Sequence, residues 1–251
     1  MLRSVNEITN FVLKARDGEI GRCKDFLFDD EQWVVRYMVA DTGKWLPGRK
    51  VLVSPISLGE PEWDSKRLPV NLNTETIEKA PGIEEDAPVS RQYESKWFSY
   101  YRYPYYWSGG GIWGGGIHPG ALASEKKELA RAVEDEGSGD SHLRSAGEIT
   151  GYHIQAKDGE IGHVEDFVLD DETWVIRYMV VDTRNWLPGR KVLIAPAWVE
   201  SFDWAKQKAE VDLTRQAVRN SPEYDPADYV RREYEEHLHD YYNRPRYWQR
   251  A

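Results

Sequence analysis

The chain has 251 residues, a formal net charge of −10, 15 tyrosines, 11 tryptophans and a single cysteine. The acidic balance argues against a nucleic-acid partner or an anionic membrane surface, because both are bound through a basic face. One cysteine excludes an internal disulfide framework, and no stretch approaches the roughly 20 apolar residues of a transmembrane helix. Residues 1–4 lead directly into polar sequence, which predicts no secretory signal. We therefore expect a soluble, cytoplasmic protein without direct membrane insertion.

Residues 4–107 and 145–248 are two copies of one sequence, offset by 141 residues without a gap. The clearest match joins residues 45–52 to residues 186–193, which both read WLPGRKVL. A repeat of this length predicts two domains rather than one. A domain of this size buries only about 60% of its unfolded surface, so its stability is marginal unless another element braces it.

The first copy is expected to begin with a hairpin. Residues 7–14 are rich in β-branched and apolar side chains, which predicts a strand. Asp17 and Gly18 are expected to supply the positive-φ positions of a tight turn, after which the chain returns along residues 21–28. The hydrophobic alternation slips near Asp25, which predicts a β-bulge or a strand buried on both faces.

The rest of the copy predicts short strands and one helix. Further strands are expected at residues 33–41, 50–53, 57–63 and 68–72. Asn73 or Thr74 then starts a short helix, which Pro81 ends. Five or six short strands joined by hairpin turns indicate a small antiparallel barrel. The predicted fold class is therefore mainly β, with two tandem barrels at residues 4–81 and 145–222.

An aromatic arm follows each predicted barrel, at residues 82–107 and 223–251. In both arms the large side chains recur at the spacing of one helix face. Several tyrosines and tryptophans carry too much apolar surface to leave in water. Each arm therefore packs on its own or the other barrel and braces it, or packs on another chain and mediates oligomerisation. The candidate interaction surface comprises Tyr93, Trp97, Tyr100, Tyr101, Trp107, Tyr234, Leu238, Tyr241, Tyr242 and Trp248.

A linker at residues 108–144 joins the two copies. Its first part is a glycine run at residues 109–116, and its second part is charged. The run lacks the Gly-Lys-Ser/Thr ending of a phosphate-binding loop, so it predicts a spacer. Ile112 and Trp113 interrupt the glycines, and we expect them to anchor the linker onto a barrel.

The order of these motifs resembles the PRC-barrel family, which is named for a domain in the H subunit of the photosynthetic reaction centre. The resemblance rests on an Asp-Gly-x-Ile-Gly turn, a Trp-x-Val/Ile-Arg-Tyr-Met-Val strand and a Gly-Arg-Lys-Val-Leu strand, each of which occurs twice. It covers about residues 4–81 and 145–222. The resemblance implies a six-stranded barrel-like fold that serves as a docking or assembly module. It implies no common reaction and no catalytic residues.

Few residues indicate chemistry. Cys23 matches Val164 in the other copy, which favours a core residue over a nucleophile. None of the six histidines is repeated. His237 and His239 lie at i and i+2 of a predicted helix, so they do not face each other, and we interpret the histidines as solvated. The acidic turns at residues 29–31 and 170–172 are interpreted as solvated turns rather than metal sites.

These observations predict a non-enzymatic protein-binding or assembly module, without a cofactor, a metal or catalytic residues. We expect a protein partner, self-association into a homo-oligomer, or both. Two alternatives stay open from the sequence. One is a hydrolase-like enzyme with a site between the barrels, and the other is a small-ligand or carbohydrate binder that uses exposed tryptophans.

Overall fold

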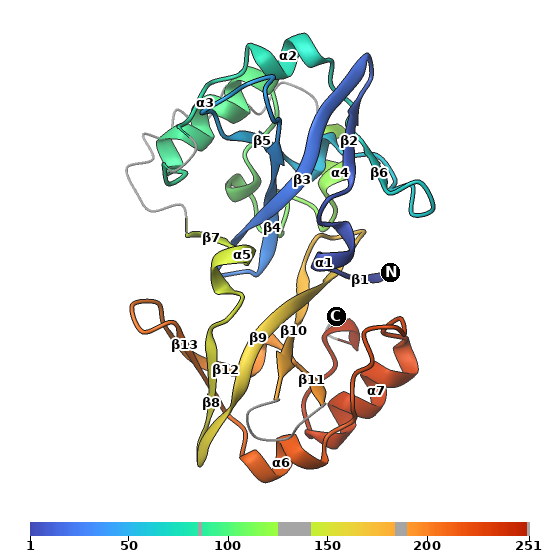
Figure 1. Cartoon of the computed structure of the whole chain (residues 1–251), viewed down its shortest axis with the longest axis vertical. Coiled ribbons are helices and arrows are strands. Elements are labelled where there is room, and N and C mark those ends of the chain that lie inside the picture. The colour runs from blue at the N-terminus through green and yellow to red at the C-terminus, as the bar shows by residue number, and fades with distance from the viewer. Residues whose placement is uncertain (85–86, 125–141, 184–189, 250–251) are drawn as a thin grey trace. The chain divides into compact units, whose positions relative to one another are not determined.

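A computed structural model of the chain describes residues 1–84, 87–124, 142–183 and 190–249. The described residues form a mainly β structure with two sheets and few helices (Figure 1). They divide into two compact units. Unit 1 contains Met1–Asn6, Glu148–Asp171 and Ile176–Ala251, and unit 2 contains Glu7–Gly147 and Glu172–Val175. Each unit is thus built from one copy of the repeat together with short segments of the other copy.

The sheet of unit 2 follows the order β5-β4-β3-β2-β6, and β7 pairs with β3 in addition. Neighbouring strands are antiparallel except β2 and β6, which run parallel. The bounds are β2 (Val12–Ala15), β3 (Gly18–Asp29), β4 (Val34–Asp41), β5 (Val51–Val53), β6 (Arg67–Pro69) and β7 (Leu143–Ser145).

The sheet of unit 1 follows the equivalent order β11-β10-β9-β8-β13-β12, and β1 pairs with β9. Its bounds are β1 (Leu2–Ser4), β8 (His153–Ala156), β9 (Gly159–Asp170), β10 (Ile176–Asp182), β11 (Lys191–Ile194), β12 (Val199–Asp203) and β13 (Lys208–Val211). Within the described residues neither strand order closes on itself. The mainly β class is therefore confirmed, whereas a closed barrel is not seen.

The described helices are short. The α-helices are α1 (Val5–Ile8), α2 (Thr74–Glu78), α3 (Arg91–Tyr101), α4 (Pro119–Ser124), α5 (Ala146–Ile149), α6 (Arg215–Asn220) and α7 (Arg232–Tyr241). The 3-10 helices are η1 (Pro55–Ser57), η2 (Tyr106–Ser108), η4 (Pro196–Trp198) and η5 (Tyr247–Gln249). In the part of the chain that is described, no helix combines the length and the apolar character that crossing a membrane requires.

The predicted bulge near Asp25 is confirmed. The pairing of β3 with β4 shifts between Cys23 and Asp25, so β3 carries one extra residue relative to β4 at this point. The expected conformation of the preceding turn is wrong, because Gly18 does not take a positive φ. The positive φ falls instead on Gly21, at 124°, where a Cβ would lie 2.0 Å from the carbonyl oxygen of Asp41. Close approach of two backbones therefore requires glycine at that position.

The predicted strand at residues 7–14 is only partly correct. Residues 5–8 form α1, and β2 begins at Val12. Asn10 takes a φ of 74° between the two elements, a conformation that asparagine tolerates better than most residues. Ile8 is fully buried at this corner. An apolar run of this length reads as a strand by composition, but its first residues bury their side chains from a helical turn.

Each sheet contains one strand that is not part of the copy forming the rest of the sheet. This strand lies at the start of the other copy. In unit 1, β1 runs along the end of β9, with Leu2 opposite Asp170 and Ser4 opposite Val168. In unit 2, β7 runs along the end of β3, with Leu143 opposite Asp29. The two pairings are equivalent under the offset of 141 residues. Neither sheet is complete with the strands of one copy alone.

A carboxylate at the bulge fixes the end of each exchanged strand. In unit 1, Asp166 accepts hydrogen bonds from the Ser4 hydroxyl and from the Asn6 N–H at 3.1 Å. In unit 2, Asp25 accepts from the Ser145 hydroxyl and from the Gly147 N–H at 3.0 Å. Both carboxylates lie at a bulge, where an extra residue bends the strand and redirects its side chains.

Replacing Asp166 or Asp25 by alanine is expected to loosen the exchanged strand of one unit. Loss of the acceptor removes the hydrogen bonds that the serine hydroxyl and the backbone N–H donate to it, which lowers the free energy of unfolding by about 1–3 kcal/mol. Amide hydrogen exchange should accelerate in β1 for Asp166→Ala and in β7 for Asp25→Ala. The control is Asp64→Ala, an exposed position, which should change stability by less than about 0.5 kcal/mol. Unchanged exchange in β1 and β7 would refute this role.

Candidate functional site

Glu94 on α3 is a completely buried carboxylate in unit 2. Its Oε1 accepts hydrogen bonds from the hydroxyls of Tyr37 and Tyr106, at 2.9 and 3.0 Å. Its Oε2 accepts one from the guanidinium of Arg91 at 2.8 Å. A carboxylate without water is unfavourable unless such donors replace the lost hydration.

The local sequence brings these donors together. Ser90 caps α3 by accepting a hydrogen bond from the N–H of Tyr93. The helix ends at Tyr101, and the following residue, Arg102, has a left-handed φ of 57° that turns the chain back. Figure 1 shows α3 running alongside β5. The returning segment then places Tyr106, in η2, beside the carboxylate that α3 carries.

Unit 1 repeats the arrangement residue for residue. Glu235 on α7 accepts hydrogen bonds from Tyr178 at 3.0 Å and Tyr247 at 2.9 Å, and Arg232 pairs with it at 2.9 Å. We refer to the two sets as the arm clamps. They consist of Tyr37, Arg91, Glu94 and Tyr106 in unit 2, and of Tyr178, Arg232, Glu235 and Tyr247 in unit 1.

The arm clamps are not among the sites predicted from the sequence. All eight residues are identical between the copies under the offset of 141, although most of the arm sequence has diverged. A charged residue kept in both copies on the aromatic face of a helix was the available signal. When both copies keep the same charged residue at such a position, a buried and paired charge is indicated rather than a solvated one.

The clamp of unit 1 contains an additional member, His239. Its ring is 3% exposed, with Nε2 at 3.0 Å from the Tyr178 hydroxyl and Nδ1 at 3.1 Å from the Pro245 carbonyl oxygen. The solvated interpretation is therefore wrong for this histidine. It occupies the position of Phe98, a core residue of the first copy, and burial lowers its pKa.

Burial raises the pKa of Glu94 to about 7, against the opposing effect of Arg91 and the two tyrosine hydroxyls. Burial also raises the pKa of Glu235. A carboxyl that titrates near neutral pH has the acidity of a general acid or base. Glu94 has no exposed surface, however, and its oxygens already accept three hydrogen bonds. The geometry fits attachment of the arm rather than contact with a substrate.

The candidate interaction residues divide into three groups. Trp97 and Leu238 lie in the interior of their own units, at 1% and 0% exposure, so neither is available to a partner. Tyr100 and Tyr241 are exposed, at 36% and 37%. The remaining residues are half-buried: Tyr93, Tyr101, Trp107, Tyr234, Tyr242 and Trp248.

The linker residue Trp113 is completely buried in unit 2. Its indole N–H donates to the Thr173 carbonyl oxygen at 2.8 Å, and the Arg36 guanidinium lies 4.9 Å from the ring centroid. Arg36 also donates to the Ile112 carbonyl oxygen. The expected anchoring of the linker at Ile112 and Trp113 is thus observed within this unit. Residues 125–141 of the predicted linker lie outside the described residues.

The acidic turns are paired with cations. Asp29 is buried and forms an ion pair with Arg36 at 2.6 Å, and Asp30 pairs with Arg144 at 2.7 Å. No group of three or more potential metal ligands occurs among the residues that the structure describes. Cys23 lies in the core at 1% exposure, and burial raises the pKa of its thiol, so the residue resists ionisation.

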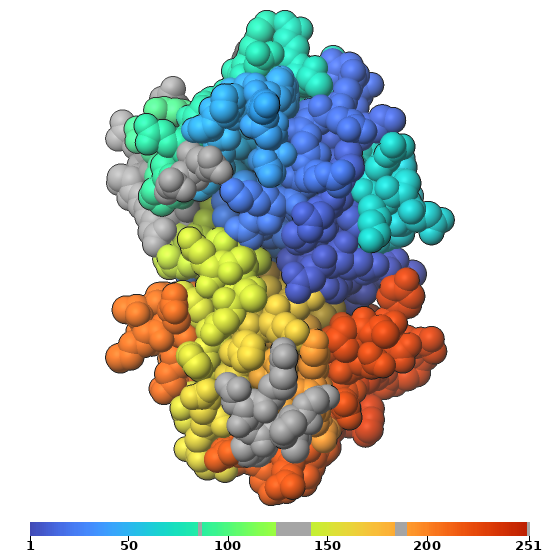
Figure 2. Space-filling model, in the orientation of Figure 1, coloured from blue at the N-terminus to red at the C-terminus, as the bar shows by residue number. Residues whose placement is uncertain are grey.

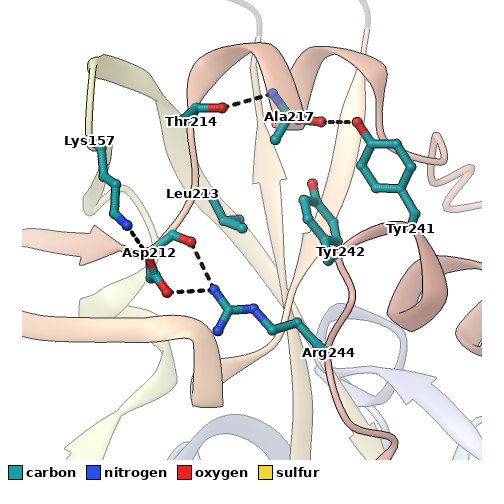
Figure 3. Close-up of a pocket in the computed structure, with 8 residues that line it drawn as sticks. All are labelled: Lys157, Asp212, Leu213, Thr214, Ala217, Tyr241, Tyr242 and Arg244. Carbon is teal, nitrogen blue, oxygen red and sulfur yellow. Dashed lines mark hydrogen bonds and ion pairs between the residues drawn. The ribbon is translucent and has the colours of Figure 1, made fainter.

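A pocket of about 340 Å³ lies on unit 1 (Figure 3). Three charged side chains line one side of it, namely Lys157, Asp212 and Arg244. Asp212 lies between the two cations, with Lys157 bonded to its Oδ1 and Arg244 to its Oδ2 at 2.7 Å. The other lining residues are Leu213, Thr214, Ala217, Tyr241 and Tyr242.

Compared with protein-family models and with curated proteins, the sequence matches none of them.

Replacing Glu94 or Glu235 by alanine is expected to detach an arm. Each substitution removes the acceptor of two buried hydroxyls and an arginine, which lowers the free energy of unfolding by about 2–4 kcal/mol. Denaturant unfolding of the full chain, followed by tryptophan fluorescence, measures the effect. Glu78→Ala, an exposed glutamate that precedes the arm, is the control and should be nearly neutral. Equal stability of all three variants would rule out the clamp.

The raised pKa of Glu94 predicts how its contribution depends on pH. The carboxyl has a higher pKa folded, about 7, than its ordinary value of 4.5, so the folded state retains the proton longer. Its contribution to stability is therefore greatest below pH 4.5 and decreases as the pH rises to 7, by on the order of 3 kcal/mol.

The stability difference between the native chain and Glu94→Gln isolates this contribution, since glutamine does not titrate. The difference should shift against the native chain between pH 4.5 and 7. The corresponding difference for Glu78→Gln should stay constant. A difference for Glu94→Gln that does not vary with pH would contradict the assignment.

Proposed function

We propose that the chain is a non-enzymatic, cytoplasmic binding or assembly module, built from two PRC-barrel-like domains whose aromatic arms are braced by the arm clamps. The observation that carries the proposal is the duplicated clamp. In each unit a buried carboxyl group of the arm helix accepts hydrogen bonds from two tyrosines and pairs with an arginine. A carboxyl enclosed in this way holds parts of the fold together, whereas a catalytic carboxyl needs access to a substrate.

The exposed surface of the arms supports a protein partner. Tyr100 and Tyr241 occupy the same position in the two copies and keep about a third of their surface exposed. Each hydroxyl donates to a backbone carbonyl at 2.8 Å, that of Thr76 or that of Ala217. These bonds hold the rings in place before a partner arrives. A rigid tyrosine offers a large contact area at a low cost in conformational entropy, which favours it at interfaces.

A second ring reinforces each exposed tyrosine. Tyr100 packs edge-on against Tyr101 with ring centroids 4.9 Å apart, and Tyr241 packs on Tyr242 in the same way at 4.9 Å. Figure 2 shows the C-terminal arm, in red, on the molecular surface. We propose that the two tyrosine pairs are equivalent docking points for a protein, with a second copy of the chain as one such partner.

Site-specific photo-crosslinking in the native host tests this proposal. A photoreactive amino acid at Tyr100 or at Tyr241 is expected to yield one discrete cross-linked species. The matched control is Lys206, an exposed position outside the arms, which should yield none. Light scattering of the purified chain separates self-association from a different partner. No product from either arm, or the same products from Lys206, would overturn protein docking through the tyrosine pairs.

A further inference from the structure

The pocket on unit 1 has a charge that differs in sign from the chain as a whole. Two cations, Lys157 and Arg244, and one anion, Asp212, line it, whereas the whole chain carries a net charge of −10. Its volume of about 340 Å³ is in the range of sites for small organic ligands. A local positive charge in an acidic protein favours an anionic ligand.

Asp212 orients the two cations without using all their donors. The Arg244 guanidinium donates through one nitrogen to the Asp212 carbonyl oxygen at 2.9 Å and to its Oδ2 at 2.7 Å. Lys157 pairs with the other carboxylate oxygen. An arginine has five N–H donors and a lysine three, so further donors remain on both side chains. Hydrogen bonds from both cations lower the pKa of Asp212 to about 2, so this carboxylate remains ionised.

The opposite wall of the pocket is apolar and aromatic. Figure 3 shows the ring of Tyr242 on the far side from Lys157, with Leu213 between them. Ala217 and Tyr241 extend this wall, and the Tyr241 hydroxyl is occupied by the Ala217 carbonyl oxygen. A ligand that fits both walls has a planar apolar body and an anionic group at one end.

The first copy of the repeat lacks this combination of charges. Asn71 replaces Asp212 and Tyr103 replaces Arg244, while Arg16 matches Lys157. The Tyr103 ring stacks on Tyr101 with an angle of 12° between the rings, and its hydroxyl lies 2.9 Å from that of Ser57. An aromatic ring in unit 2 therefore takes the place of the guanidinium that lines the pocket in unit 1.

We propose that the pocket on unit 1 binds a small aromatic carboxylate. The carboxylate meets Arg244 and Lys157, and the ring lies against Leu213 and Tyr242. Charge-assisted hydrogen bonds from a guanidinium suit a planar carboxylate group. A ligand with an ammonium group is disfavoured because it meets two cations. The site occurs in one copy only, and although Tyr241 and Tyr242 also form one of the tyrosine pairs, benzoate binding does not require protein docking there.

Nuclear magnetic resonance of the 15N-labelled full chain tests the proposal with three probes that share one ring. Benzoate is expected to shift the amide signals of residues 212–217 and 241–244 in a saturable manner. For benzyl alcohol and benzylamine, the ligand concentration that half-saturates the shifts of the same signals should be at least tenfold higher. Equal binding of benzyl alcohol would overturn the proposal, because the charged side chains would then play no part. The absence of saturable shifts with benzoate would also overturn it.

Arg244→Tyr introduces the residue of the first copy and should weaken benzoate binding at least tenfold. Arg231→Tyr is the matched control, since it makes the same change at an exposed position of the same arm. Lys157→Met provides a second test that does not alter the arm. The native Lys157 side chain is 55% exposed. Benzoate binding that is unchanged in both Arg244→Tyr and Lys157→Met would refute the site, whatever cross-linking shows for Tyr100 and Tyr241.

Discussion

A buried carboxylate organises each unit. Glu94 and Glu235 stay buried because donors from three parts of the chain replace their hydration: a tyrosine of β4 or β10, an arginine one helical turn earlier and a tyrosine of the returning segment. One charge thereby ties the sheet, the arm helix and the chain beyond it. This requirement also accounts for part of the unusual tyrosine content, because tyrosine supplies a hydroxyl donor together with a large apolar body.

The exchange of strands makes the two copies interdependent. The strand before each copy completes the sheet of the unit that the other copy forms, and a carboxylate at the bulge holds its end. Each compact unit of the structure therefore differs in its residues from one copy of the repeat. A sheet whose edge is occupied by another segment also exposes fewer unpaired backbone groups, which limits edge-to-edge aggregation.

The two copies differ where structure does not constrain them. The clamp residues are the same in both units. At two pocket positions, however, Arg244 corresponds to Tyr103 in the first copy, and Asp212 corresponds to Asn71. His239 in place of Phe98 shows that even the core beside the clamp accepts a polar ring, provided that both nitrogens find partners. Divergence of this kind is expected after duplication, because bracing is needed in both units and a ligand pocket in only one.

The repeat, the mainly β class and the bulge at Asp25 follow from the sequence, because periodicity and turn residues are local properties of the chain. The buried Cys23 was likewise predictable from its apolar counterpart Val164. The clamps, the buried His239 and the exchanged strands were decided by tertiary structure. Each joins residues far apart in sequence, such as Tyr37 with Glu94 or Ser4 with Asp166. A polar side chain in the interior is stable only when donors converge on it, and the periodicity of one segment does not show which distant residues those donors are.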